Sequence, residues 1–121
     1  KLSELFIGIG AFVIEPAVTR KVGKSAFSTL TLEATEWHSA AWALDKGLFS
    51  KVFPNIEEMQ AAAEKMSTAL ASYSPEALFE MKKVFWEGTE HWDTLLAERA
   101  AISGKLVLSK FTKEILQKFK K

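Results

Sequence analysis

A single carboxylate, Glu4, is the first residue in this chain whose surroundings point to chemistry. It stands in Leu2-Ser3-Glu4-Leu5-Phe6-Ile7, between apolar side chains on both sides. A carboxylate that such neighbours partly remove from water is suited to proton transfer. The alternative is that Glu4 lies on the exposed face of an edge strand and is only solvated. The local pattern by itself leaves both interpretations open.

The other groups that could do chemistry give weaker patterns. Glu87 and His91 are four residues apart, which is the spacing of half a metal site on a helix, but no second histidine pattern completes it. A solvated histidine that pairs with nearby acids is the simpler interpretation. The chain has no cysteine and no Gly-x-Ser-x-Gly sequence, so it lacks both a thiolate nucleophile and the serine elbow of hydrolases. We therefore expect no metal site.

Composition and charge indicate a globular chain with a basic end. The 121 residues are 48% hydrophobic and have a formal net charge of +1. Residues 54–100 contain nine acidic and four basic residues, whereas residues 105–121 contain six lysines and one glutamate. The lysine-rich end indicates docking onto the acidic middle, an anionic ligand, or a solvated helix face. The basic residues lack interleaved stacking aromatics, so nucleic-acid binding is not expected.

The chain begins at Lys1 without an initiator methionine and runs at once into apolar sequence, so we expect it to be a piece of a longer protein. The longest uncharged apolar stretch, residues 5–14, is about half the length that a membrane-spanning helix needs. We therefore expect a cytoplasmic protein without a membrane partner.

Apolar periodicity predicts that helices position these groups, with about two short strands. Apolar residues from Leu2 to Ile9 favour a buried strand, and Leu48–Phe53 alternates as a second strand would. Cap residues, glycines and apolar spacing predict helices from Glu15 to near Gly23, from Thr35 to Gly47, after Asn55 as far as Tyr73, after Ser74, from Thr89 to Gly104, and from Phe111 to Phe119.

A series of motifs, in order along the chain, resembles the crotonase family of enoyl-CoA hydratases and isomerases. Ser3-Glu4 with Gly8-Ile9 is similar to that family's Pro-Glu-x-x-x-Gly-Leu, and Arg20 to Ala26 is similar to its Arg-x-x-Gly-x-x-Ala. Further matches run from Ala40 to Leu48 (Ala-x-x-Ala-x-x-x-Gly-Leu) and from Ser74 to Lys82 (Ser-Pro-x-Ala-x-x-x-x-Lys). Each motif is moderately specific, and their common order gives the resemblance its strength.

The resemblance implies that the chain is the C-terminal half of such a protein. Residues 1–53 would end the family's ClpP/crotonase-type ββα spiral, and residues 54–121 would form its helical trimerisation region. The fold class expected is therefore mostly α with short β segments. The oxyanion hole and a first catalytic glutamate would lie upstream of Lys1, so this piece alone is expected to be inactive, and the intact protein is expected to be a homotrimer or hexamer.

The resemblance also implies a reaction and a site. Glu4 would be the general acid/base in the hydration of a 2-enoyl-CoA, with a methylglutaconyl-CoA-like substrate as one form, and coenzyme A would enter as part of the substrate with no separate cofactor. The alternatives are a double-bond isomerase or an oligomerisation module without catalysis of its own. Glu15, at a position where the family usually has a small residue, is either a further site carboxylate or an acid that favours a helix N-terminus. The substrate-binding residues implied are Gly8, Gly10, Phe12, Lys118 and Lys121.

Overall fold

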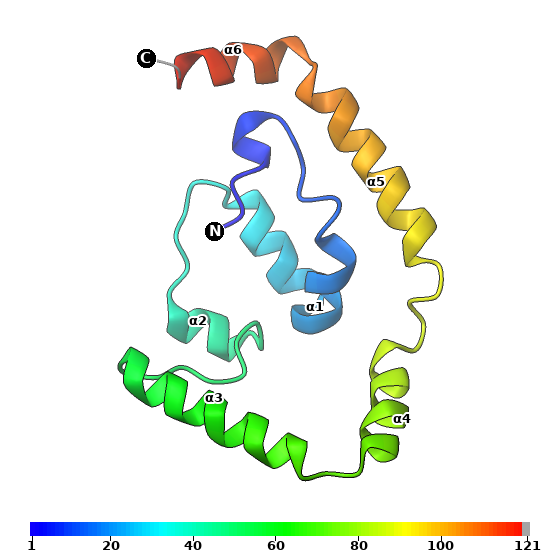
Figure 1. The fold of residues 1–121 in the computed structure, drawn as a ribbon. Helices are drawn as coiled ribbons and strands as arrows, with labels where there is room; N and C mark the ends of the chain where they lie inside the picture. Colours follow the sequence, from blue (N-terminus) through cyan, green and yellow to red (C-terminus); the bar gives the residue numbers. More distant parts are fainter. Residues whose placement is uncertain (120–121) are drawn as a thin grey trace. The chain divides into compact units, whose positions relative to one another are not determined.

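The computed structural model describes residues 1–119, which form helices joined by short loops (Figure 1). The elements are η1 (Leu5–Ile7, a 3₁₀ turn), α1 (Glu15–Leu32), α2 (Ala40–Asp45), α3 (Ile56–Ala71), α4 (Pro75–Trp86), α5 (Trp92–Val107) and α6 (Lys110–Lys118). They belong to two compact units, one of residues 1–50 and 93–121 and the other of residues 51–92. No helix in residues 1–119 is both long and apolar enough to cross a membrane.

The prediction of short strands and of a ββα spiral was wrong, because residues 1–119 contain no strand. Residues 4–9 instead close a tight turn, in which the Glu4 carbonyl accepts from the amides of Ile7 (3.2 Å) and Ile9 (2.9 Å). A strand needs a neighbouring backbone to accept and donate its hydrogen bonds, and here local turn bonds satisfy those groups. The 48–53 segment likewise has no ladder partner and runs into Pro54, which has no amide hydrogen to offer.

The helix predicted to stop near Gly23 bends there and continues. Gly23 has φ 76° and ψ 163°, outside the helical region, and α1 resumes beyond it to Leu32. Glycine tolerates a positive φ without the clash that a Cβ causes, so it permits this kink. The sequence located the break correctly but missed that the following residues return to a helix.

Several helix starts follow the predicted caps. The Asn55 side chain accepts from the Glu58 amide (2.8 Å) at the start of α3, and the Ser74 hydroxyl accepts from the Ala77 amide (3.3 Å) at the start of α4. The cap predicted at Thr35 was wrong, because Ser39 caps the short α2 by accepting from the Trp42 amide. The three residues between these two positions stay non-helical.

The C-terminal helices also differ in their bounds from the expected ones. α5 passes through Gly104, where a stop was predicted, and ends three residues later at Val107. The Ser109 hydroxyl then accepts from the Thr112 amide (3.2 Å) and starts α6. One glycine costs a helix about 1 kcal/mol relative to alanine, which neighbouring good helix formers can outweigh.

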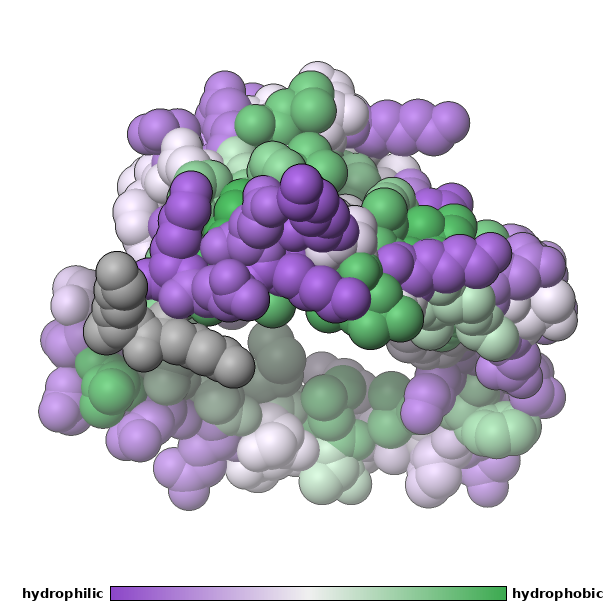
Figure 2. Space-filling view, turned by 90° about the horizontal axis from the view of Figure 1, so that it is seen from above, coloured by the Kyte–Doolittle hydropathy of each residue, from purple (hydrophilic) through white to green (hydrophobic). Residues whose placement is uncertain are grey.

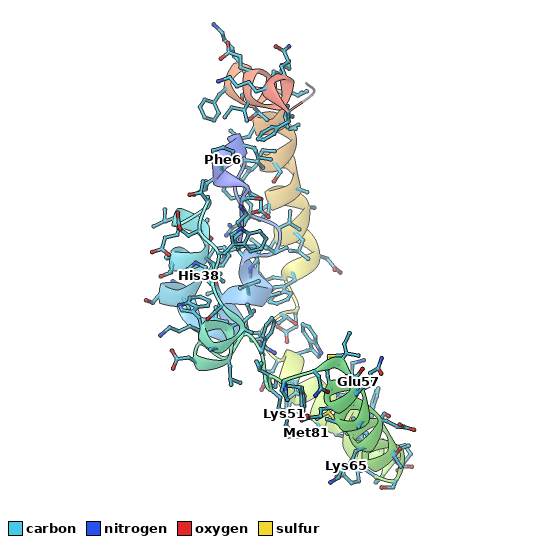
Figure 3. All side chains as sticks on the ribbon, turned by 90° about the vertical axis from the view of Figure 1, so that its left-hand side faces the viewer. Phe6, His38, Lys51, Glu57, Lys65 and Met81 are labelled. Atoms are coloured by element: carbon cyan, nitrogen blue, oxygen red, sulfur yellow. The ribbon has the colours of Figure 1, made fainter. Side chains whose placement is uncertain are left out.

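Buried side chains lie in the first unit. They are five apolar or small residues and one threonine: Ala11, Ala26, Leu30, Ala34, Ala43 and Thr112. η1 packs against α6, where the rings of Phe6 and Phe119 meet edge to face with centroids 6.4 Å apart, and Figure 3 shows Phe6 projecting from that turn. In residues 51–92 no side chain is buried. Figure 2 shows hydrophobic residues at the surface between hydrophilic ones.

Candidate functional site

Glu4 is held by the turn that it starts. Its backbone is helical (φ −61°, ψ −41°), and Gly8 ends the turn with φ 82° while its amide donates to the Leu5 carbonyl (3.1 Å). The apolar residues around Glu4 therefore wind round a 3₁₀ turn rather than alternate across a strand. The side chain is half-buried, and its Oε2 is buried with no hydrogen-bond partner among the described residues.

A cavity of about 170 Å³ lies beside this carboxylate. The lining consists of Glu4, the loop from Ile9 to Ile14, and Ser103 of α5. Glu4 and Ser103 are the lining residues with polar side chains, and most of the other lining residues are apolar. Binding sites for whole drug-sized molecules usually measure about 300–1,000 Å³, so this cavity suits a small part of a ligand.

Two of the residues predicted to bind substrate, Gly10 and Phe12, line the cavity with Glu4. Gly10 is buried, and a Cβ added there would overlap the Phe12 ring. The missing side chain therefore allows Phe12 to lie against the backbone of the loop. The sequence-predicted association of Glu4, Gly10 and Phe12 in one place is a feature of the structure, while their roles in binding stay predictions.

Gly8 occupies a different environment, because it lies outside the cavity lining and faces α6. A Cβ at Gly8 would lie 2.6 Å from both Phe111 Cδ1 and Thr112 Oγ1. This distance is well inside van der Waals contact, so the turn approaches α6 closely only because residue 8 has no side chain. The substrate-binding role of Gly8 stays a prediction, whereas its close packing against α6 is observed in the structure.

Glu15 takes part in an ion pair at the edge of the site. It lies in the first turn of α1, where an acid is favourable, and its Oε2 is 3.4 Å from Nη2 of Arg99. Neither Arg99 nor Ser103 was singled out from the sequence. Their four-residue spacing within a helix carries no sign that this face meets a loop some ninety residues earlier.

Lys118, one of the two lysines expected to bind an anion, does not line the cavity. Lys118 is exposed in the last turn of α6, and Lys121 lies outside the described residues. Lys110 in the same helix has its Nζ 3.8 Å from Oε1 of Glu114. Among residues 1–119, no group of three or more acidic or histidine side chains could hold a metal ion.

Comparison with known proteins identifies the family. The search of curated proteins returned no match, and the search of solved structures returned none. The family model described as enoyl-CoA hydratase/isomerase matches residues 1–120, nearly the whole chain. The motifs around Glu4, Ala26, Gly47 and Lys82 point to the same family. The chain therefore belongs to the enoyl-CoA hydratase/isomerase family.

Proposed function

We propose that the protein containing this chain hydrates a 2-enoyl-CoA thioester and that Glu4 is its general acid/base. A methylglutaconyl-CoA-like acyl group is one form of this substrate, and coenzyme A enters as part of it. The observation that carries the proposal is the place of Glu4: one carboxylate oxygen is buried and has no partner among the described residues, and Glu4 is one of the residues that line a mostly apolar cavity. Family membership supplies the reaction class.

The role proposed for Glu4 in this reaction is proton transfer. In hydration the water oxygen bonds to C3, the C2–C3 double bond becomes single, and C2 gains a proton. A carboxylate beside the acyl chain takes a proton from the attacking water or delivers one to C2. An unpartnered carboxylate oxygen is free to do this, because no hydrogen bond within the protein must first be broken.

The cavity volume indicates which part of the substrate it accepts. About 170 Å³ holds a short acyl chain and excludes the nucleotide portion of coenzyme A. We assign the acyl group to this cavity and the phosphates to a basic surface elsewhere. Lys118 and Lys121 are proposed for that contact, because both belong to the lysine-rich end of the chain.

A double-bond isomerase is the alternative within the same family. One carboxylate suffices to remove a proton from one carbon of the acyl chain and return it to another. The two reactions differ in product: hydration adds a water molecule to the acyl group, and isomerisation leaves its mass unchanged. Mass spectrometry of the thioester product separates them.

The experiment compares Glu4→Gln and Glu4→Asp with the unaltered protein, in the full natural chain, on 2-enoyl-CoA and 3-enoyl-CoA substrates. Glu4→Gln should lower kcat by about 10²–10⁴-fold, the usual contribution of a general acid/base. Glu4→Asp should retain part of the activity because a carboxylate remains. Glu57→Gln, at an exposed position of α3, is the matched control and should change nothing. Full activity of Glu4→Gln would contradict the role of Glu4.

Self-association is a second candidate function, favoured by the exposed apolar residues of α3 and α4. The seam predicted for α3 is exposed along its length, from Ile56 (62% exposed) to Tyr73 just after the helix (55%). An amphipathic helix gains stability when its apolar face is covered. We propose that these faces meet other copies of the protein in a homotrimer or hexamer.

A further inference from the structure

One residue that lines the cavity beside Glu4 comes from a distant part of the chain. Seven of its lining residues come from Glu4 and the Ile9–Ile14 loop, and the eighth is Ser103 of α5. Within residues 1–119 its hydroxyl makes one long hydrogen bond, donating to the Arg99 carbonyl at 3.4 Å. One side of the cavity therefore consists of a small side chain whose placement depends on where α5 lies.

An ion pair fixes that part of α5 to the loop. Arg99 precedes Ser103 by four residues, so both lie on one face of the helix. Its Nη2 is 3.4 Å from Oε2 of Glu15, and Glu15 directly follows Ile14, the last lining residue of the loop. Both side chains are largely covered, with 31% of Arg99 and 26% of Glu15 exposed. The pair thus joins the two segments that supply the cavity lining.

The packing of α5 at this level is sparse. No residue of α5 is buried, and a Cβ added to Gly104 would meet nothing within 4 Å. Where apolar packing is sparse, an ion pair with partly covered partners has more influence on local position than it would beside a dense core. Loss of such a pair changes an equilibrium constant by up to about fivefold.

We propose that Ser103 determines which acyl chains the cavity admits, and that Arg99 and Glu15 are positioning residues that hold Ser103 in place. This inference rests on the proposed function, because it assigns the acyl group to the same cavity. It extends that function to α5, a helix that contributes nothing to the proton transfer itself. A larger side chain at position 103 would fill the cavity and shorten the acceptable chain.

The first test is the ratio of kcat/KM for an eight-carbon and a four-carbon 2-enoyl-CoA, measured on the full natural chain. Ser103→Leu should lower this ratio by about tenfold or more, since each methylene that loses its place in an apolar pocket costs about tenfold or more. Ser103→Ala should keep the ratio within about twofold. Ala101→Leu adds the same side chain at an exposed position of α5 and serves as the matched control. Equal ratios for Ser103→Leu and Ala101→Leu would overturn the role of Ser103.

The second test concerns the ion pair. Arg99→Glu and Glu15→Arg should each raise KM for the eight-carbon substrate about fivefold with kcat little changed, and the double exchange should restore KM. Hydrogen exchange should show faster exchange of the residue 9–14 amides in each single variant and restored protection in the double variant. A general loss of folding would lower kcat and protection throughout and would not be rescued. Single variants with wild-type KM and wild-type protection would overturn the positioning role.

The same tests distinguish a failure of the Ser103 proposal from a failure of the proposed hydratase function. An unaltered protein without activity on any enoyl-CoA would contradict the proposed function, and the assignment of Ser103 to acyl selection would fall with it. The hydrogen-exchange comparison would still decide whether Arg99 and Glu15 hold the loop. Activity in the unaltered protein, combined with unchanged acyl preference in Ser103→Leu, would contradict only the inference.

Discussion

Single residues decide how the turn that carries Glu4 is built. Glu4 supplies the carbonyl that accepts two amides, and Gly8 supplies the positive φ that ends the turn. The resemblance drew attention to both residues as site residues. The structure gives Gly8 a further task, since its missing side chain lets the turn lie against Phe111 and Thr112 of α6.

Gly8→Ala should therefore destabilise the protein by more than the backbone cost alone. An alanine at φ 82° costs about 1 kcal/mol relative to glycine, and the close contacts at 2.6 Å add the penalty of overpacking, about 1–3 kcal/mol. Urea unfolding followed by circular dichroism measures the sum.

Gly88→Ala is the matched control for this prediction. Gly88 has nearly the same φ, 80°, but a Cβ there would meet nothing within 4 Å. Its substitution should cost about 1 kcal/mol, the backbone term alone. Equal losses of stability in the two variants would show that the approach of α6 to the turn is not what residue 8 permits.

At the scale of elements, local hydrogen-bonding rules were the most dependable predictors. Asn55 and Ser74 cap their helices as the sequence indicated, because a cap needs only a side chain and an amide three residues later. The two strands failed for the opposite reason, since a strand needs a partner that no local pattern identifies. At two glycines the helix continued although a stop was predicted. α1 resumes after a kink at Gly23, and α5 runs through Gly104.

The start of α4 gives a prediction that includes pH dependence. The amide of Glu76 itself, and then the Ser74 hydroxyl, which donates to Glu76 Oε2 at 2.9 Å, lower the pKa of Glu76 below its usual value of 4.5. A lowered pKa in the folded state stabilises the protein above pH 4.5, and this contribution is lost as the pH falls through the folded-state pKa.

Ser74→Ala should move the pKa of Glu76 upward, toward 4.5, in an NMR titration of its carboxyl group. It should also cost about 1 kcal/mol of stability at neutral pH through the lost cap to the Ala77 amide, and this difference from the unaltered protein should narrow in acid. Ser67→Ala, at an exposed position inside α3, removes a hydroxyl that donates to the Glu64 carbonyl and should leave the Glu76 titration unchanged without a loss of stability. An unchanged Glu76 titration in Ser74→Ala would refute the hydrogen bond as a cause.

At the scale of the whole molecule, exposed apolar surface is the dominant feature. Large apolar side chains of α3 and α4 lie open to solvent, among them Met66 (53% exposed), Phe79 (60%) and Phe85 (62%). Monomeric soluble proteins seldom leave such faces uncovered, and contiguous apolar patches usually mark contact surfaces. This is the physical basis for the proposed self-association.

Met66→Lys combined with Leu70→Lys should therefore weaken self-association, because both residues belong to the exposed apolar seam of α3. Sedimentation velocity over a range of protein concentrations should show a shift toward smaller species. Gln60→Lys combined with Thr68→Lys adds the same two charges at other exposed positions of α3 and should leave the distribution unchanged. Identical distributions for both variants and the unaltered protein would place the contact surface elsewhere.

The sequence by itself determined the mostly helical character of the chain, several helix starts and the family. These follow from patterns within a few residues: caps, apolar periodicity and motif order. Only the tertiary structure decided that the first apolar segment is a turn, that Gly8 lies against α6, and that Ser103 and the Arg99–Glu15 pair border the cavity. Such contacts join residues up to about a hundred positions apart, and spacing along a chain does not record which distant face a side chain will meet.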